Sequence, residues 1–197
     1  MHLYTSPAAW PRIAPLARAL GARAVLLADH SGDDPFDEAC STIWPRLAAR
    51  FGAATPIPSA CVAVTVELRG ESDVSNPLAG RDAQAIVDYL TTLGVVDRPL
   101  PASPAALCEP TPLAGSIPVT APHGGVVVYL GDTGATVKAG ERLADLVEPM
   151  TGDVTPLLSP VDGVVYARET RRFVPAGATV LRVAGREALR RGNLLTA

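Results

Sequence analysis

Histidines are the side chains of this 197-residue sequence best suited to bind a metal ion, and there are three of them. His30 directly follows Asp29 and stands three residues before Asp33, which is a His-x-x-Asp spacing. A catalytic zinc ordinarily takes about three protein ligands, and Asp, Ser and Gly in polar loops normally form turns. His2 and His123 lie far from this loop in the sequence. We therefore favour a turn here and keep a metal site as the alternative.

A carboxylate and a guanidinium stand close together at the end of another segment. Residues 61–68 form the clearest strand pattern of the sequence, with Glu67 near its end and Arg69 two positions further on. If the strand extends that far, both side chains share one face. Arg69 could then bind a substrate carboxylate through two parallel hydrogen bonds, or it is a solvated arginine at a loop entrance. Taken alone, Glu67 is typical of an exposed strand end.

The elements that must position these side chains follow an α/β pattern. We predict strands at 2–5, 24–28 and 61–68, with helices that end at Gly21, at Gly52 and at Gly94. The second helix covers 35–51. The third places five apolar residues on its buried face, namely Leu78, Ile86, Tyr89, Leu90 and Leu93. Three successive βα units with right-handed crossovers would make the strands parallel.

Prolines are frequent between residues 97 and 122, and they exclude helix interiors and central strands there. The chain beyond it contains a β-rich repeat, because the run 121–129 is echoed by 159–166, and 138–146 is echoed by 175–183. Two such copies can bury a face that neither buries alone. The predicted organisation is an α/β domain at 1–96, a linker at 97–118, a β domain at 119–186 and a tail at 187–197.

The repeat resembles the lipoyl/biotinyl hammerhead, with P-x-x-G-x-V opening a strand and V-x-x-G-x-x-L following a turn, twice over. A working carrier of that kind attaches its cofactor to a lysine on the hairpin between the halves. This sequence has Thr151 at that position, and Lys138, its single lysine, lies in an earlier turn. A hydroxyl cannot replace the amine, so we interpret the repeat as structural and keep a carrier function as a minor alternative.

A broader resemblance covers residue 2 to about 185. His-Leu-Tyr-Thr at 2–5, Val-Leu-Leu-Ala-Asp at 25–29 and Val-Thr-Val-Glu-Leu-Arg-Gly at 64–70 are similar to segments of the succinylglutamate desuccinylase/aspartoacylase family. That family also joins an α/β domain to an unmodified hammerhead. The resemblance implies a partial zinc-carboxypeptidase-like α/β domain followed by an all-β barrel-sandwich, corresponding to the C-terminal portion of such a protein.

The resemblance also implies a chemistry, the zinc-dependent hydrolysis of the amide bond of small N-acyl amino acids. Zinc would polarise the carbonyl and acidify a water molecule, while a glutamate at a strand end moves the proton. Glu67 matches that glutamate, which we expect among hydrophobic neighbours. His2 would face the same cleft and contact the substrate, or it is an ordinary surface or packed histidine. The family's His-x-x-Glu and Asp-x-His zinc ligands are missing from this sequence, so we expect this chain to bind no zinc and to be inactive alone.

The composition excludes several other classes of function. Twenty acidic residues outnumber seventeen basic ones, for a net charge of −3, so no basic stripe is available to a nucleic acid. No apolar run approaches the roughly 20 residues that cross a bilayer, and no secretory leader pattern opens the chain. We expect a cytoplasmic protein whose three cysteines are ordinary thiols.

An incomplete α/β domain would have a physical consequence. A sheet without its neighbouring strands exposes unpaired edges, so we expect self-association. Met1 stands directly before the first strand, as an internal methionine of a longer reading frame would. The competing hypothesis is a non-catalytic binding or scaffold protein derived from the same family.

Overall fold

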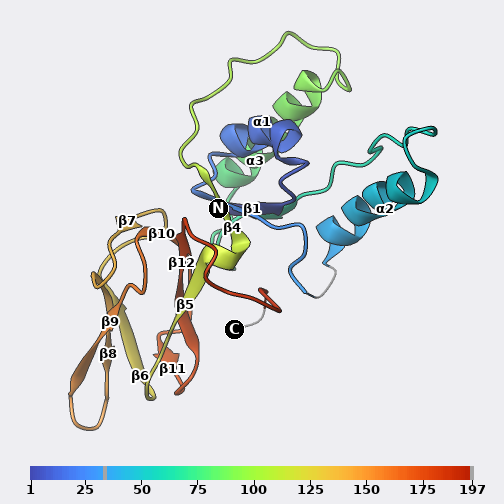
Figure 1. The fold of residues 1–197 in the computed structure, drawn as a ribbon. Helices are drawn as coiled ribbons and strands as arrows, with labels where there is room; N and C mark the ends of the chain where they lie inside the picture. Colours follow the sequence, from blue (N-terminus) through green and yellow to red (C-terminus); the bar gives the residue numbers. More distant parts are fainter. Residues whose placement is uncertain (33–34, 196–197) are drawn as a thin grey trace. The chain divides into compact units, whose positions relative to one another are not determined.

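The computed structural model describes residues 1–32 and 35–195 (Figure 1). The chain divides into two compact units, Met1–Pro110 and Thr111–Ala197. The division falls inside the segment 97–118, in which the sequence predicted a linker. Each unit has its own hydrophobic core and is described separately.

The first unit is a small mixed sheet with three helices, as Figure 1 shows. Its strand order is β3-β1-β2-β4, and β1 and β2 are parallel, with His2 opposite Ala24. Gly21 ends the first helix in the left-handed conformation, at φ 69°, which is why a glycine stands there. The elements are β1 (His2–Thr5), α1 (Trp10–Leu20), β2 (Ala24–Leu27), α2 (Phe36–Phe51), β3 (Thr65–Glu67) and α3 (Asn76–Thr92). Strand β4 (Pro110–Pro112) begins at the last residue of this unit.

The direction of β3 differs from the prediction. Strand β3 is antiparallel to β1, so the three strands do not form a series of parallel βα units. Residues 52–64 return the chain to the end of the sheet where β1 and β2 finish, and β3 therefore runs back along β1. Helix α2 consequently does not act as a crossover between parallel strands.

The predicted strand at 61–68 is also shorter than expected, because only Thr65–Glu67 pairs. Residues 61–64 are apolar for another reason. Val62 and Val64 pack against the core, and Ala63 is buried, with its carbonyl accepting a 3.1 Å hydrogen bond from Thr5 Oγ1. The apolar residues at 62–64 therefore pack in or against the core without being paired in a strand.

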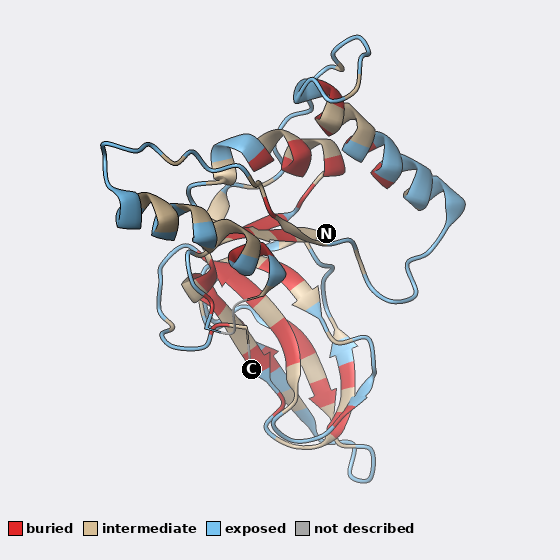
Figure 2. Ribbon diagram, turned by 90° about the vertical axis from the view of Figure 1, so that its right-hand side faces the viewer, coloured by how far each residue is buried: buried red, intermediate tan, exposed pale blue. Residues whose placement is uncertain are grey.

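The core of this unit lies between the sheet and the α1/α3 pair. Leu3 and Val25 from the sheet meet Ile13 and Leu16 of α1, and α3 contributes Tyr89. Figure 2 shows buried residues along the strands and along one side of the helices. The buried face of α3 differs from the predicted one: Asp82, Ala85, Tyr89 and Thr91 are buried, whereas Ile86 and Leu93 are exposed.

The second unit consists of two four-stranded antiparallel sheets and a short 3₁₀ turn, η1 (Leu113–Gly115). The sheet orders are β5-β12-β10-β7 and β11-β6-β8-β9. A closed barrel is not found among the described strands, so the predicted barrel-sandwich is observed only as this pair of sheets. The strands are β5 (Ser116–Thr120), β6 (Gly125–Tyr129), β7 (Thr136–Val137), β8 (Arg142–Val147), β9 (Val154–Leu158), β10 (Gly163–Arg168), β11 (Phe173–Val174) and β12 (Thr179–Gly185).

The repeat seen in the sequence recurs in this topology. Strands β5 to β8 of the first copy correspond in order to β9 to β12 of the second. If each strand is replaced by its counterpart in the other copy, the strand order of one sheet becomes that of the other. Each sheet takes its two inner strands from one copy and its two outer strands from the other. Pro118 lies in β5, which is an outer strand, where a residue without an N–H group is tolerated.

Glycines mark equivalent points of the two copies. Gly140 and Gly177 turn the chain at φ 81° and φ 80°, a region that favours glycine. Gly125 and Gly163 open β6 and β10, where a Cβ atom would collide with the backbone of the neighbouring strand. The P-x-x-G-x-V pattern therefore has a steric cause.

Candidate functional site

The register between β1 and β3 places Glu67 directly opposite His2. In an antiparallel pair, opposite residues lie on the same face of the sheet, so the structure brings these two predicted site residues together. Tyr4 shares that face, and its hydroxyl lies 3.0 Å from His2 Nε2 while the two rings meet edge to face. Glu67 is exposed. Its exposure differs from the expected enclosure by hydrophobic neighbours.

Arg69 lies beyond the end of β3 and is held by α3. Its Nη1 and Nη2 atoms donate hydrogen bonds of 2.7 and 2.9 Å to the two carboxylate oxygens of Asp82. The side chains are only 18% and 11% exposed. The hydrogen bond from Arg69 keeps the pKa of Asp82 below its ordinary value, and the same bond raises the pKa of Arg69.

This ion pair bears on the predicted role of Arg69. Because β3 ends at Glu67, the two residues do not share a strand, contrary to one condition of the prediction. Both terminal nitrogens of the guanidinium are engaged with Asp82. Binding of a substrate carboxylate by Arg69 stays a prediction. Sequence reasoning missed Asp82, although it stands at helical spacing from Ala85 and Tyr89 on the buried face of α3.

The described residues do not fit a zinc site with three protein ligands. Among residues 1–32 and 35–195, no three His, Cys, Asp or Glu side chains gather in a position to hold a metal ion. His2 lies beside Tyr4, with Glu67 opposite it on β3 and Ala24 opposite it on β2. His30 is exposed in the loop after β2, and its predicted partner Asp33 lies outside the described residues. We therefore assign no metal-dependent step to these side chains.

The remaining sequence candidates lie in the second unit. His123 has Nε2 2.8 Å from Thr155 Oγ1 and Nδ1 2.9 Å from the Gly124 carbonyl, so it links the turn before β6 to β9. Lys138 precedes β8, and its Nζ pairs with Asp162 at 2.8 Å. In the β8–β9 hairpin, Thr151 stands where a carrier would need its lysine, and its backbone N–H donates to Glu148.

Several solved structures share the fold of this chain. A succinylglutamate desuccinylase/aspartoacylase family protein from Shewanella amazonensis SB2B superposes with a TM-score of 0.75 over 93% of this chain, at 24% identity. One from Shewanella frigidimarina NCIMB 400 gives 0.72 over 93%, at 23% identity. The ectoine utilization protein EutE from Ruegeria pomeroyi gives 0.67 over 93%, at 16% identity.

The chain has the fold of part of a succinylglutamate desuccinylase/aspartoacylase family protein. It spans about half the length of these structures, 50% of each Shewanella protein and 55% of EutE. At these identities the likeness establishes the fold. No protein-family model and no curated protein matches the sequence.

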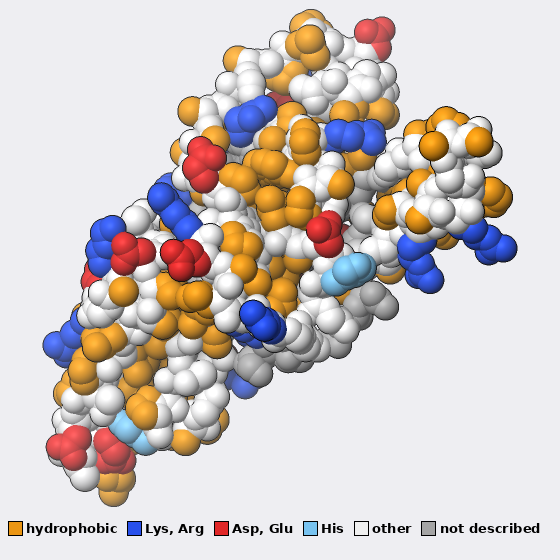
Figure 3. Space-filling model, viewed as in Figure 1, with side chains coloured by type: hydrophobic (Ala, Val, Ile, Leu, Met, Phe, Trp, Pro, Cys, Tyr) orange, Lys and Arg blue, Asp and Glu red, His pale blue; other side chains and the backbone are white. Residues whose placement is uncertain are grey.

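The surface of this chain shows mixed charge. On the face drawn in Figure 3, acidic and basic side chains are interspersed with apolar ones, and no extended basic stripe is visible. No helix among the described residues is long and apolar enough to cross a membrane.

Proposed function

We propose that this chain is the Glu67-bearing part of a zinc-dependent deacylase that hydrolyses N-acyl amino acids or similar small amides, and that it is inactive alone. The observation that carries the proposal is the position of Glu67 opposite His2 within a fold matched over 93% of the chain by family structures. Cytoplasmic location and the absence of nucleic-acid partners belong to the same proposal.

Glu67 is the proposed general base. An exposed carboxylate at the end of β3 can accept a proton from water and return it to the leaving amine. His2, on the same face, would contact the substrate with its orientation fixed by Tyr4. In this proposal the two hammerhead-like sheets are a structural module and carry no attached cofactor.

The test begins with the coding sequence ahead of Met1. We expect it to encode His-x-x-Glu and Asp-x-His in frame, and the longer polypeptide to release free amino acid from N-acyl amino acids in the presence of zinc. The 197-residue chain should release none. Inactivity of the longer polypeptide across a panel of acyl groups would contradict the proposal.

Glu67→Gln in that longer polypeptide should lower kcat by about 10²- to 10⁴-fold, because the amide cannot accept the proton. Glu71→Gln is the matched control, since Glu71 is also exposed and follows β3 at a turn. Its kcat should be unchanged. Equal activity of the two variants would remove Glu67 from the mechanism.

The second candidate is a non-catalytic binding or scaffold protein. The described residues gather no metal ligands, which a protein that keeps only the fold would not need. Elemental analysis distinguishes the candidates: stoichiometric zinc in the longer polypeptide supports the deacylase, whereas a metal-free, inactive longer polypeptide supports the scaffold.

Self-association is a further part of the proposal. Strand β3 is an outer strand of its sheet, and unpaired N–H and C=O groups on such an edge can pair with another chain. Phe36, Ile43 and Phe51, at the start, in the middle and at the end of α2, are exposed large apolar side chains. Light scattering after size-exclusion chromatography should give a mass above 20.4 kDa that rises with concentration. A concentration-independent monomer would refute this expectation.

A further inference from the structure

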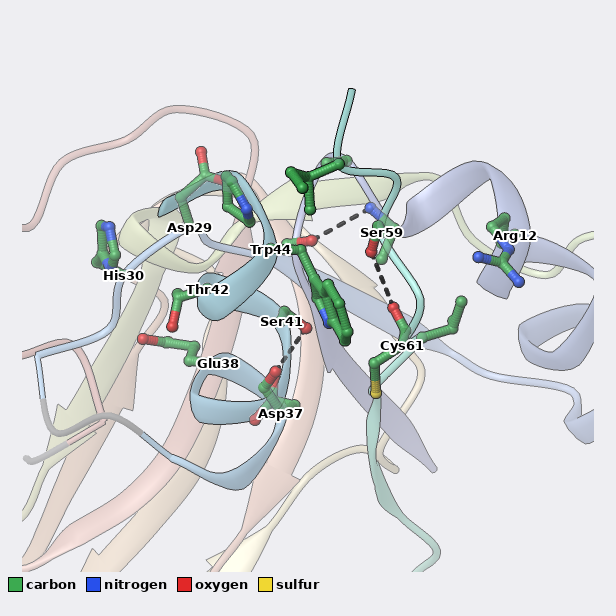
Figure 4. A pocket seen from close by; sticks show the side chains of 16 residues that line it. Arg12, Asp29, His30, Asp37, Glu38, Ser41, Thr42, Trp44, Ser59 and Cys61 are labelled. Atoms are coloured by element: carbon green, nitrogen blue, oxygen red, sulfur yellow. Dashed lines mark hydrogen bonds between the residues drawn. The ribbon is translucent and has the colours of Figure 1, made fainter. Parts of the chain in front are cut away.

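A cavity of about 480 Å³ lies at the end of the first unit's sheet that is remote from Glu67. It is lined by residues that follow β1 and β2, by the first half of α2 and by the chain before β3, as Figure 4 shows. Because β3 is antiparallel to β1, Val62 and Glu67 lie toward opposite ends of the sheet. Strands rise about 3.3 Å per residue, so this cavity is separate from the Glu67–His2 face.

Two adjacent carboxylates in the first turn of α2 line this cavity. Asp37 is 7% exposed and Glu38 is 6% exposed. The helix N-terminus favours negative charge at both positions. Asp37 Oδ1 accepts a 3.0 Å hydrogen bond from Thr65 Oγ1, on β3. Glu38 differs from Asp37, because Oε2 of Glu38 is buried and accepts no hydrogen bond.

A buried carboxylate oxygen without a donor is costly, since it has lost water and gained no partner. A donor that reaches this oxygen would satisfy Glu38, whose side chain lines the cavity. In Figure 4 the Glu38 carboxylate lies on the same side of the cavity as Thr42 and His30. The charge of the lining favours a positive donor, because Asp29, Asp37 and Glu38 outnumber its one arginine, Arg12, which is exposed.

The remaining lining favours an apolar body next to that positive group. Pro45, Ile57, Val62 and the indole ring of Trp44 line the cavity. The ring nitrogen of Trp44 is a buried donor without a hydrogen-bond partner. An indole also attracts cations to its ring face. The cavity volume lies within the range of roughly 300 to 1,000 Å³ that is usual for small-molecule sites.

We propose that this cavity binds a small primary amine as its ammonium ion, with the charged nitrogen at Glu38 and a short alkyl body against Trp44 and Ile57. An ammonium group carries only donors, which matches the acceptor that Glu38 presents. Since the cavity is remote from Glu67, the proposal stands whether or not the chain is part of a hydrolase.

The test uses two-dimensional ¹H–¹⁵N NMR of the 197-residue chain, whose two tryptophans give two indole N–H signals. The variant Trp10→Phe identifies the signal of Trp44. Pentylammonium should shift that signal saturably, with millimolar affinity. Pentanol and pentanoate match it in length but lack the positive charge, and both should bind at least about tenfold more weakly because they cannot neutralise Glu38.

Glu38→Gln keeps the shape of the side chain and removes its charge, so it should weaken pentylammonium binding at least about tenfold, a change worth about 1.4 kcal/mol. Glu71→Gln, exposed and outside the cavity, should bind like the unaltered chain. Unchanged affinity in Glu38→Gln, equal binding of pentanol, or no saturable shift would each overturn the proposal. The comparison of the three ligands on the unaltered chain decides the matter even if Glu38→Gln does not fold.

Discussion

Gly163→Ala is expected to lower the free energy of unfolding of the second unit by about 3 kcal/mol, because the added methyl group has no space to occupy. A Cβ atom at Gly163 would lie 2.9 Å from the carbonyl carbon of Ala184 and from Val183 Cγ1, and closer still to the Ala184 oxygen. The obstacle is mainly the backbone of β12, the strand that pairs with β10. A side chain could rotate away, whereas a paired strand can yield only by losing its hydrogen bonds.

Hydrogen exchange of the β12 amides measures this effect, because both tryptophans lie in the first unit and do not report on the second. The slowest amides of a unit exchange through its global opening. Gly124→Ala is the matched control, since a Cβ there would meet its nearest atom only at 3.7 Å. It should change the opening free energy by less than about 0.5 kcal/mol. Equal effects of the two substitutions would disprove the steric explanation.

Asp82→Asn is expected to lower the free energy of unfolding of the first unit by about 3 kcal/mol. Asparagine cannot accept both hydrogen bonds from Arg69, so a largely buried guanidinium would lose its counter-charge. Urea unfolding followed by tryptophan fluorescence reports on this unit. Asp88→Asn, on the same helix, removes only an exposed contact with Gln84 and should cost less than about 0.5 kcal/mol.

The effect of Asp82→Asn should also depend on pH. The pKa of Asp82 in the folded chain lies below its ordinary value of 3.8, chiefly because of the hydrogen bond from Arg69. The stabilisation is therefore fully present above about pH 5 and is lost as pH falls through the lowered pKa. Unfolding curves of the unaltered chain and of Asp82→Asn should converge in acid. A difference that stays constant down to about pH 2 would contradict this account.

The sequence predicted the existence of the main elements better than their directions. Strand β1 and helix α2 lie within one residue of the predicted ranges, because periodicity and the terminal glycines are local signals. The direction of β3 depends on where residues 52–64 lead the chain, which no local pattern encodes. Apolar alternation at 61–64 was misleading for a related reason, since burial and strand pairing produce the same pattern.

The candidate site shows the same difference between what local patterns predict and what depends on contacts between distant segments. Glu67 could be singled out through the family resemblance of residues 64–70, but its place opposite His2 depends on a pairing between segments more than 60 residues apart in the sequence. The Arg69–Asp82 pair depends on how α3 packs near the end of β3. Glu38 gave no signal at all, because a glutamate in the first turn of a helix is ordinarily a solvated side chain.

The exchange of outer strands in the second unit has a consequence for how that unit folds. Strand β7 of the first copy completes the sheet of β10 and β12, and β11 of the second copy completes the sheet of β6 and β8. Neither copy can therefore form a finished sheet from its own residues. A peptide of one copy would need a second molecule to supply the outer strands, so an isolated half should fold only as an intertwined dimer.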